Sequence, residues 1–396
     1  MPHYKKNTLK RIEKFAERIA KLHYEKLSEL ECTAYVTKEP LPYEQREEGE
    51  KKTIALGESW GQLFDCAWFN FTGALPPGYE FSDLVLLINF SGEGLYVDRS
   101  GVPVQGLTAG TVAFEYGSMP KHVLPLNGDM LLDNLVNIWI DAGCNGLFGR
   151  MIGEGKLVEA HIGLRQSELR SLSYDFAVLK GAMEQLPEDS PQYHSILFSL
   201  NAAANEMYDY TNEEAARARL ILASELAKKG ATPSLCISAI GHAHIDLAWL
   251  WPIRETIRKG ARTFSTMDRM MDRYPDYKFG VSQPQLLVWM KEHYPQLYER
   301  LKIRVAEGRL ECQGAMWVEP DTNLAGGEAL VRQILYGQRF WQEEFGVTVD
   351  NVWLPDVFGY TGSLPGIMKK SGVPYFMTHK LSWNELTNSR TILLTG

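Results

Sequence analysis

The chain has 396 residues, of which 45% are hydrophobic and 23% charged, so it has a globular composition and the length for two or three domains. Its formal net charge of −8 argues against nucleic acid or an anionic membrane as partner, and no run approaches the ~18 apolar residues of a membrane-spanning helix. The N-terminus has no signal-peptide pattern and the five cysteines lack Cys-x-x-Cys spacing, which predicts a cytoplasmic protein with reduced thiols.

The first predicted element is an amphipathic helix over residues 8–30. Lys, Arg and Glu occupy one side of this segment, and apolar residues recur near helical spacing on the other: Leu9, Ile12, Ala16, Ile19 and Leu27. This apolar stripe can pack against its own chain or against another subunit. We favour packing within the chain, and the second alternative would make the protein a homo-oligomer.

Between about residues 33 and 165 the pattern changes to short β-rich runs separated by Gly, Pro, Asn and Asp. Strands at this spacing, with turn residues between them, are typical of an antiparallel β-sandwich or jelly roll. The clearest runs are 66–71, 84–90, 94–97 and 135–140. Such a module can carry a carbohydrate-binding site, but nothing in these residues requires one, and we favour a role as scaffold.

Residues 167–229 are predicted to be helical, with Leu169, Leu172, Phe176 and Leu179 on one buried stripe. After a short linker, strands and helices alternate, which indicates an α/β domain with a parallel sheet, either a barrel or an open doubly wound sheet. The predicted strands lie near 235–241, 277–283, 309–316, 349–355 and 374–380. The predicted helices are 253–273, 285–306, 326–345 and 361–371.

These patterns divide the chain into four parts. They are an N-terminal helix (1–32), an antiparallel β-sandwich (33–166), a helical linker region (167–234) and an α/β domain (235–396). In parallel α/β domains the chemistry gathers at the carboxyl ends of the strands, where loops from several strands meet. Polar residues at the predicted strand ends are therefore the candidates for a functional site.

Residues 241–252 (GHAHIDLAWLWP) follow an apolar run that is typical of a buried strand. Side chains alternate along an extended strand, so His242, His244 and Asp246 are predicted to point the same way. Two imidazoles and a carboxylate suit a divalent metal, and zinc in particular. Taken alone, the same residues are equally well interpreted as ordinary polar groups at a strand end.

Asp356 ends a second predicted strand, at residues 352–355. By itself it is equally well interpreted as the N-cap of the following helix, which is common where a strand leads into a helix. Together with His244 and Asp246 it forms an Asp-His-Asp set at one edge of the sheet. That set is a stronger signal than any of its members, and Asp356 can serve in it as metal ligand, as nucleophile or as both.

Six stretches of the chain carry a resemblance to a known family. Four are residues 241–252, 316–324 (MWVEPDTNL), 353–360 (WLPDVFGY) and 380–384 (KLSWN), and two lie upstream, at 92–95 (GEGL) and 145–149 (NGLFG). In this order they resemble glycoside hydrolase family 38, the α-mannosidases, and most closely its cytosolic and bacterial branch. The resemblance covers the chain up to about residue 384.

The resemblance implies a role for each matching residue. His244 and Asp246 would be zinc ligands, and Asp356 would be both a zinc ligand and the nucleophile. Trp249 would pack against the sugar in the cleavage subsite, and Phe358 would line the same pocket. Weaker parallels suggest contacts with sugar hydroxyls from three residues at the mouth of the site and a supporting, non-ligating role for His242. The three mouth residues are Glu319, Asp321 and Asn323.

The implied activity is that of a zinc-dependent, retaining α-mannosidase that hydrolyses terminal α-D-mannosyl residues of oligosaccharides. Retaining glycosidases need a carboxylate nucleophile about 5–5.5 Å from an acid/base carboxyl. Zinc would serve as a template and electrostatic clamp for the sugar hydroxyls, not as a source of hydroxide. The implied partner is an oligosaccharide or another α-mannoside, and the implied fold of residues 235–396 is a (β/α) barrel.

Members of this family continue well beyond the matching part, and the resemblance places their acid/base carboxylate and a further zinc-ligating His in that later part. The barrel over residues 235–396 is therefore expected to be incomplete, with little activity on its own. One alternative is a non-catalytic fragment that binds metal or carbohydrate weakly. Another is a zinc-dependent deacetylase or similar hydrolase, which would use an Asp-His-Asp site to activate water.

Overall fold

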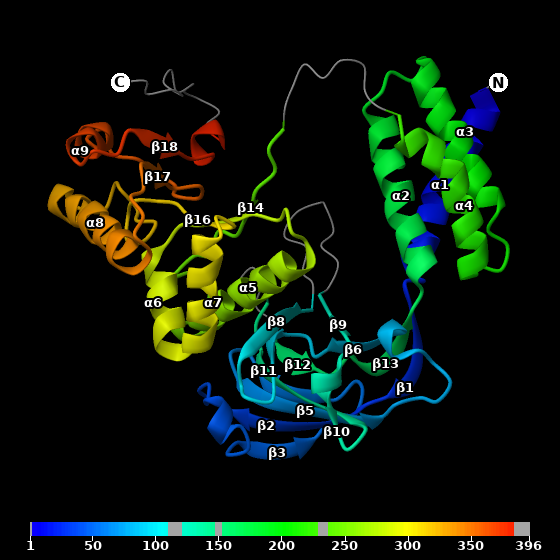
Figure 1. Ribbon diagram of the computed structural model, residues 1–396, viewed down its shortest axis with the longest axis horizontal. Helices are drawn as coiled ribbons and strands as arrows, with labels where there is room; N and C mark the ends of the chain where they lie inside the picture. Colours follow the sequence, from blue (N-terminus) through cyan, green and yellow to red (C-terminus); the bar gives the residue numbers. More distant parts are fainter. Residues whose placement is uncertain (1, 110–120, 147–152, 229–236, 384–396) are drawn as a thin grey trace.

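A computed structural model describes residues 2–109, 121–146, 153–228 and 237–383 of the chain (Figure 1). It contains an antiparallel β-sandwich, a helix bundle and an α/β unit, and each of these is built around its own hydrophobic core. In the view of Figure 1 the sandwich lies at the bottom, the bundle at the upper right and the α/β unit at the upper left. The fold class predicted from the sequence is confirmed.

The β-sandwich has two main sheets. One has the strand order β1-β13-β6-β9, and the larger has the order β3-β2-β5-β11-β7-β8, with β10 beside β11 and a separate pair of β4 and β12. The strands are β1 Tyr24–Glu29, β2 Glu31–Thr37, β3 Glu50–Thr53, β4 Ser59–Gln62, β5 Cys66–Ala74, β6 Leu84–Asn89, β7 Glu93–Val97, β8 Pro103–Thr108, β9 Val123–Pro125, β10 Leu131–Leu132, β11 Leu135–Gly143, β12 Glu154–Lys156 and β13 Glu159–Arg165. The predicted strands near residues 66, 84, 94 and 135 are all present.

Four helices form the bundle, and they are α1 Pro2–Ile19, α2 Ser167–Glu184, α3 Pro191–Asn205 and α4 Asn212–Leu226. The apolar stripe of α1 packs against them, because Ile12 and Ile19 share a buried core with Leu172 and Phe176 of α2. The prediction that this stripe packs within its own chain is confirmed. The residues that the sequence assigned to a helical linker therefore form one unit with the N-terminal helix.

The predicted helix over residues 8–30 is wrong beyond Ile19. The chain turns after α1 and enters strand β1, which pairs antiparallel with β13. Leu27 matches the helical spacing, but it packs against the core of the sandwich from within this strand. Pairing with a distant strand has here overridden a local helical periodicity, as tertiary contacts often do.

The α/β unit has the predicted alternation of strands and helices. Its elements are β14 Gly241–His242, α5 Ile253–Arg273, β15 Phe279–Val281, α6 Pro284–His293, α7 Pro295–Ala306, β16 Leu310–Cys312, α8 Gly327–Phe340, β17 Asn351–Trp353, α9 Leu364–Lys370 and β18 Tyr375–Met377. The predicted helix 285–306 is interrupted at Pro295, which begins α7 because proline cannot donate the hydrogen bond of a helix interior. Of the predicted first strand, residues 235–236 lie outside the described part and 237–240 are not a strand.

The parallel strands form two groups whose ends meet. Strands β14, β15 and β16 pair in this order, and β17 pairs with β18. The backbone of Ala315, just after β16, donates a hydrogen bond of 2.7 Å to the carbonyl oxygen of Asn351 in β17. This bond connects the two groups, so that the loops after β14, β16 and β17 open at one edge.

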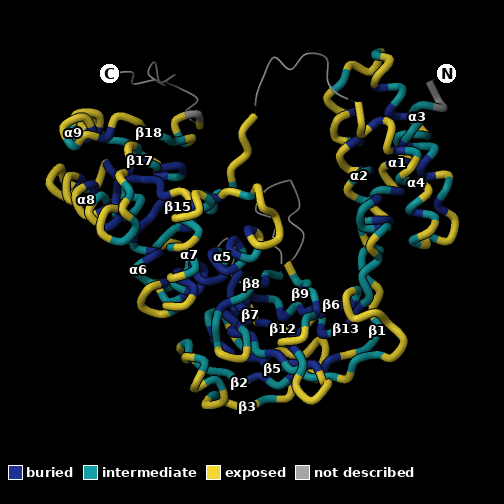
Figure 2. Tube along the Cα trace, viewed as in Figure 1, coloured by how far each residue is buried: buried dark blue, intermediate teal, exposed yellow. Residues whose placement is uncertain are grey.

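Helix α5 is the element that joins the sandwich to the α/β unit. It packs along β7 and β8, and the Thr266 side chain accepts a hydrogen bond of 2.9 Å from the backbone of Gly106. Figure 2 shows α5 as a largely buried segment above the sandwich. Helix α5 starts directly after residues 241–252. Its packing against the sandwich therefore constrains the loop that carries the candidate metal ligands.

Two further expectations concern the whole chain. Four cysteines, Cys32, Cys66, Cys144 and Cys312, are buried and form no disulfide, while Cys236 lies outside the described residues. Among the helices of the described residues, none combines the length and the apolar character needed to cross a bilayer.

Helix α8 packs closely against residues 314–317, which follow strand β16. This packing gives a prediction about stability. A Cβ atom at Gly337 would lie 2.1 Å from the carbonyl oxygen of Ala315, so Gly337→Ala should lower the free energy of unfolding by about 1–3 kcal/mol. In Gly181→Ala on α2 the Cβ atom would meet nothing within 4 Å, and the change should stabilise the protein by up to about 1 kcal/mol. Thermal unfolding of both variants measures this difference, and a Gly337 variant as stable as the Gly181 variant would contradict the packing.

Candidate metal centre

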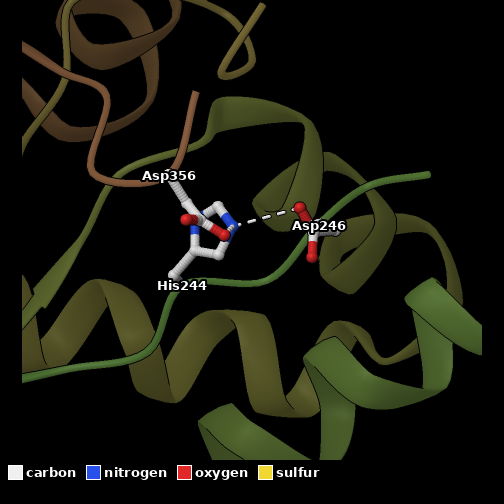
Figure 3. A group of neighbouring side chains, drawn as sticks. All are labelled: His244, Asp246 and Asp356. Atoms are coloured by element: carbon white, nitrogen blue, oxygen red, sulfur yellow. Dashed lines mark hydrogen bonds and ion pairs between the residues drawn. The ribbon is translucent and has the colours of Figure 1, made fainter. Parts of the chain in front are cut away.

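His244, Asp246 and Asp356 come together at the carboxyl ends of the parallel strands (Figure 3). His244 and Asp246 lie in the loop between β14 and α5, and Asp356 lies in the loop after β17. Each offers one ligand atom, and these atoms all lie within 4.8 Å of one another. Residues more than a hundred positions apart thus form one cluster, which the sequence predicted from their places at two strand ends.

The cluster is centred on one ring nitrogen. His244 Nε2 lies 3.1 Å from Asp246 Oδ1 and 3.6 Å from Asp356 Oδ2. The three side chains are between a quarter and a third exposed, so solvent or a ligand can reach them. An imidazole nitrogen and two carboxylate oxygens are a donor set that suits zinc, and catalytic zinc sites commonly have three protein ligands.

Glu319 supports the cluster from behind. Its Oε2 lies 2.8 Å from His244 Nδ1, and its side chain is only 6% exposed. A carboxylate on one ring nitrogen holds the proton there and leaves the lone pair of the other nitrogen for a metal. The sequence suggested a contact between Glu319 and sugar, whereas the structure places this carboxylate against the back of the imidazole.

A buried glutamine fixes the two loops relative to each other. Gln283 Nε2 donates a hydrogen bond of 2.9 Å to the carbonyl oxygen of Ile245, and its Oε1 accepts one of 3.1 Å from the backbone of Glu319. The side chain of Gln283, just after β15, therefore sets the spacing between the loop of His244 and the loop of Glu319. The sequence predicts a strand that ends at residue 283, but it indicates no role for Gln283.

The surroundings of His244 favour positive charge. Burial lowers the pKa of His244, but the hydrogen bonds to Asp246 and Glu319 outweigh burial and raise that pKa to about 10. Nearby, burial and the charge of His244 lower the pKa of His242 to about 4. The cluster thus stabilises a cation between its donors, which is the electrostatic property that a metal site needs, and the residues present fit a divalent metal.

His242 does not join the donor cluster. Strand β14 ends at this residue, and its ring packs between Phe279 and Trp353 at centroid distances of 6.4 and 5.0 Å. Its Nε2 lies 3.3 Å from Ser282 Oγ, which in turn donates a hydrogen bond of 3.2 Å to Glu319. Within the described residues, His242 is thus linked to the cluster through the side chains of Ser282 and Glu319, and strand β14 ends before His244.

Lys380 is a neighbour of the cluster that was not among the residues predicted from the sequence. Its Nζ lies 2.6 Å from Asp356 Oδ1, and its side chain is 8% exposed. The ammonium group also lies over two aromatic rings, 3.6 Å from the centroid of Trp383 and 4.4 Å from that of Phe358. The KLSWN motif contained this cation just after strand β18, and its place at a strand end is the signal that could have identified it. Asn384 of that motif lies outside the described residues.

The remaining candidate residues lie on the same loops or beside them. Trp249 is 50% exposed and Phe358 72% exposed, three positions after Asp246 and two after Asp356 respectively. Asp321 Oδ1 accepts a hydrogen bond of 2.9 Å from the backbone of Asn323, so this carboxylate shapes its own loop. Both residues are exposed. They remain accessible to a ligand, in contrast to Glu319.

Comparison with known proteins connects the β-sandwich and the α/β unit to one group of enzymes. Residues 234–391 match the family model described as the glycosyl hydrolases family 38 N-terminal domain, and residues 27–170 match the alpha-mannosidase jelly roll domain. The two matches together include the sandwich and the whole donor cluster. They also include both upstream motifs, although residues 147–149 of the second lie outside the described part.

Individual relatives are similar over most of this chain. Alpha-mannosidase 2C1 of Mus musculus is 36% identical over 370 residues, which cover 90% of this chain and 35% of the relative. Alpha-mannosidase G of Dictyostelium discoideum is 34% identical over 96% of this chain and 36% of its own length. An alpha-mannosidase of Saccharomyces cerevisiae is 32% identical over 87% of this chain and 33% of its own length. The chain spans about a third of the length of these relatives.

The contact between Glu319 and His244 gives a prediction about metal binding. Glu319→Gln removes the charge that orients the imidazole, so the affinity for Zn²⁺ should fall by about 10–100-fold. Calorimetric titration of the metal-free protein with Zn²⁺ measures this change. Glu311→Gln is the matched control, because Glu311 is exposed on strand β16. An unchanged affinity in the Glu319 variant would show that the carboxylate does not support a metal ligand.

Proposed function

Because this chain carries the N-terminal domain of the family 38 glycosyl hydrolases together with the α-mannosidase jelly roll domain, we propose that it provides the metal site and the nucleophile of an α-mannosidase. The reaction is the hydrolysis of terminal α-D-mannosyl residues of oligosaccharides, with retention of configuration. The observation that carries the proposal is the position of Asp356. Its carboxylate lies beside His244 of the donor cluster and also beside the buried ammonium group of Lys380.

Zinc is the metal that we propose for the cluster. His244, Asp246 and Asp356 would hold it, and their nitrogen and oxygen donors are those of catalytic zinc sites. Once bound, the ion would supply positive charge and a template that orients the hydroxyls of the sugar ring. Glu319 would keep His244 in the tautomer that binds metal, and we therefore assign it this role in preference to contact with sugar.

Asp356 is the proposed nucleophile. One of its oxygens would attack the anomeric carbon while the bond to the leaving oxygen breaks, giving a glycosyl ester of Asp356. Water would then attack the anomeric carbon and release mannose together with the free carboxylate. A separate acid/base carboxyl would protonate the leaving oxygen and later take a proton from the water. Lys380, 2.6 Å from Oδ1, would keep the carboxylate oriented for attack.

The exposed aromatic side chains suit the binding of a sugar ring. Trp249 and Phe358 follow the metal ligands on two different loops and present apolar surface to solvent. We propose that they contact the apolar faces of the mannosyl ring, and that Asp321 and Asn323 contact its hydroxyls. We place the protein in the cytoplasm, as its four buried and unpaired cysteines suit a reducing compartment.

The first test separates the nucleophile from the acid. Dinitrophenyl α-mannoside has a leaving group that departs without protonation, so the first step, which releases dinitrophenol, requires Asp356 but not the acid. Wild-type protein loaded with Zn²⁺ should release dinitrophenol, and a chelator should stop the release. Asp356→Asn should lower the rate by at least about a thousandfold. Asp350→Asn, at the opposite end of the same strand, should leave the rate unchanged because this side chain is exposed and distant from the donor cluster.

Three outcomes would replace the proposal. A folded protein that binds zinc without any turnover is a non-catalytic binding module. Cleavage of an N-acetylated sugar, with α-mannosides left intact, points to a metal-activated water and a deacetylase. Undiminished turnover in Asp356→Asn removes this residue from the role of nucleophile.

Lys380 gives a second prediction. Lys380→Gln removes a charge-assisted hydrogen bond to Asp356, so kcat should fall about 10–100-fold while KM changes little. The affinity for Zn²⁺ should not fall, because Lys380 is not a metal ligand. Lys380→Arg should restore most of the activity. An unchanged kcat in Lys380→Gln would mean that the lysine has only a structural role.

A further inference from the structure

The jelly roll domain meets helix α5 through a cluster of buried charges. Three cations and three anions are each at most 6% exposed, so the charges balance within the cluster. They are Arg258, Lys259 and Arg262 on α5, Glu255 at the start of α5, Glu93 on β7 and Asp141 on β11. Burying six charges is costly unless each is paired, and apolar residues would hold two domains together more cheaply. Such a cluster therefore suggests a role beyond holding the two domains together.

Glu93 organises one half of this cluster. Its Oε2 accepts a hydrogen bond of 2.7 Å from Asn145 and forms ion pairs with Lys259 and with Arg262, the latter at 3.3 Å. Glu93 and Asn145 belong to the two upstream motifs, GEGL and NGLFG, for which the proposed reaction has no use. The next residue, Gly94, leaves room for the ring of Phe90, since a Cβ atom there would lie 2.4 Å from that ring.

Arg258 organises the other half. It forms a two-pronged ion pair with Asp141, with distances of 2.5 and 3.0 Å, and a further ion pair with Glu255. These contacts lie within the interface itself. Arg262 also lies 3.5 Å from Glu255 and so links the two halves. Asp141, whose ion pair is with Arg258, therefore gives the control for the contacts of Lys259.

Lys259 connects the jelly roll to the loop of the metal ligands. Its Nζ lies 4.5 Å from the ring centroid of Trp251, in the geometry of a cation–π contact. Trp251 Nε1 donates a hydrogen bond of 3.0 Å to Thr256, whose hydroxyl donates one of 2.8 Å to the carbonyl oxygen of Leu247. Leu247 directly follows Asp246. The loop over residues 246–252 is thus held near both of its ends by side chains of α5.

We propose that Lys259, held in place by Glu93 of the jelly roll, is a positioning residue for the loop over residues 246–252. The jelly roll then determines how Asp246 and Trp249 are presented, although no side chain of the jelly roll needs to touch metal or sugar. The part that concerns metal and sugar rests on the proposed function. The part that concerns the orientation of the loop rests only on the contacts of Lys259, Trp251 and Thr256.

Fluorine NMR of protein labelled with 5-fluorotryptophan tests the orientation of the loop directly. Trp251→Phe and Trp249→Phe assign the two loop resonances. Lys259→Met keeps the length and apolar character of the side chain but removes its charge, and it should shift and broaden the resonance of Trp251. Lys259→Arg should restore the wild-type resonance. Asp141→Asn weakens the other half of the cluster, and it should leave the loop resonances in place even if it lowers the melting temperature.

Glu93→Gln alone removes the buried negative charge that pairs with Lys259 and Arg262, and the variant can fail to fold. The double variant Glu93→Gln/Lys259→Met removes one charge of each sign, so the cluster stays balanced. It should fold and show the same shift of Trp251 as Lys259→Met alone, because both changes act through one contact. If the double variant shifts Trp251 further than Lys259→Met alone does, Glu93 does not act through Lys259.

Zinc affinity and turnover extend the test to the site. Lys259→Met should weaken the binding of Zn²⁺ about tenfold and raise KM for dinitrophenyl α-mannoside more than it lowers kcat, while Lys259→Arg and Asp141→Asn keep wild-type values. A wild-type protein that binds no zinc defeats the proposed function, but the NMR arm still decides the role of Lys259. A wild-type Trp251 resonance in Lys259→Met, or the same shift in Asp141→Asn, overturns the inference.

Discussion

The site depends on three carboxylates that surround a single imidazole and that require positive charge among them. Asp246, Asp356 and Glu319 all approach His244, and carboxylates this close repel one another unless a cation lies among them. Lys380 balances one oxygen of Asp356 from the side, and Nε2 of His244, which faces Asp246 and Asp356, is left to a proton or a metal. The fold therefore creates a site whose most stable occupant carries positive charge.

The loops that meet there are short of regular structure, and buried polar side chains hold them in place. Gln283 connects the loop of His244 to the loop of Glu319, and Thr256 holds the backbone next to Asp246. Both side chains are almost fully buried. Rigid supports of this kind keep ligand atoms at fixed distances, which a metal site requires more than a purely structural loop does.

Much of this arrangement could be predicted from local sequence patterns. The alternation of strands and helices after residue 240 predicted the order of the elements, and α5 has the predicted bounds. The places of His244, Asp246 and Asp356 at strand ends predicted that they would meet. Three features escaped prediction because each depends on contacts between distant residues: the strand at residues 24–29, the packing of His242 between aromatic rings, and the ion pair of Lys380 with Asp356.

The contact between α5 and the jelly roll also has a consequence for folding during synthesis on the ribosome. All strands of the sandwich precede residue 166, so Glu93 and Asp141 are already available when the basic residues of α5 leave the exit tunnel. Domains usually fold in the order in which they are made. A finished sandwich can then neutralise Arg258, Lys259 and Arg262 at once, whereas the same helix emerging alone would remain a solvated, positively charged segment. The sandwich, which is made first, would thus provide a charged docking surface for helix α5.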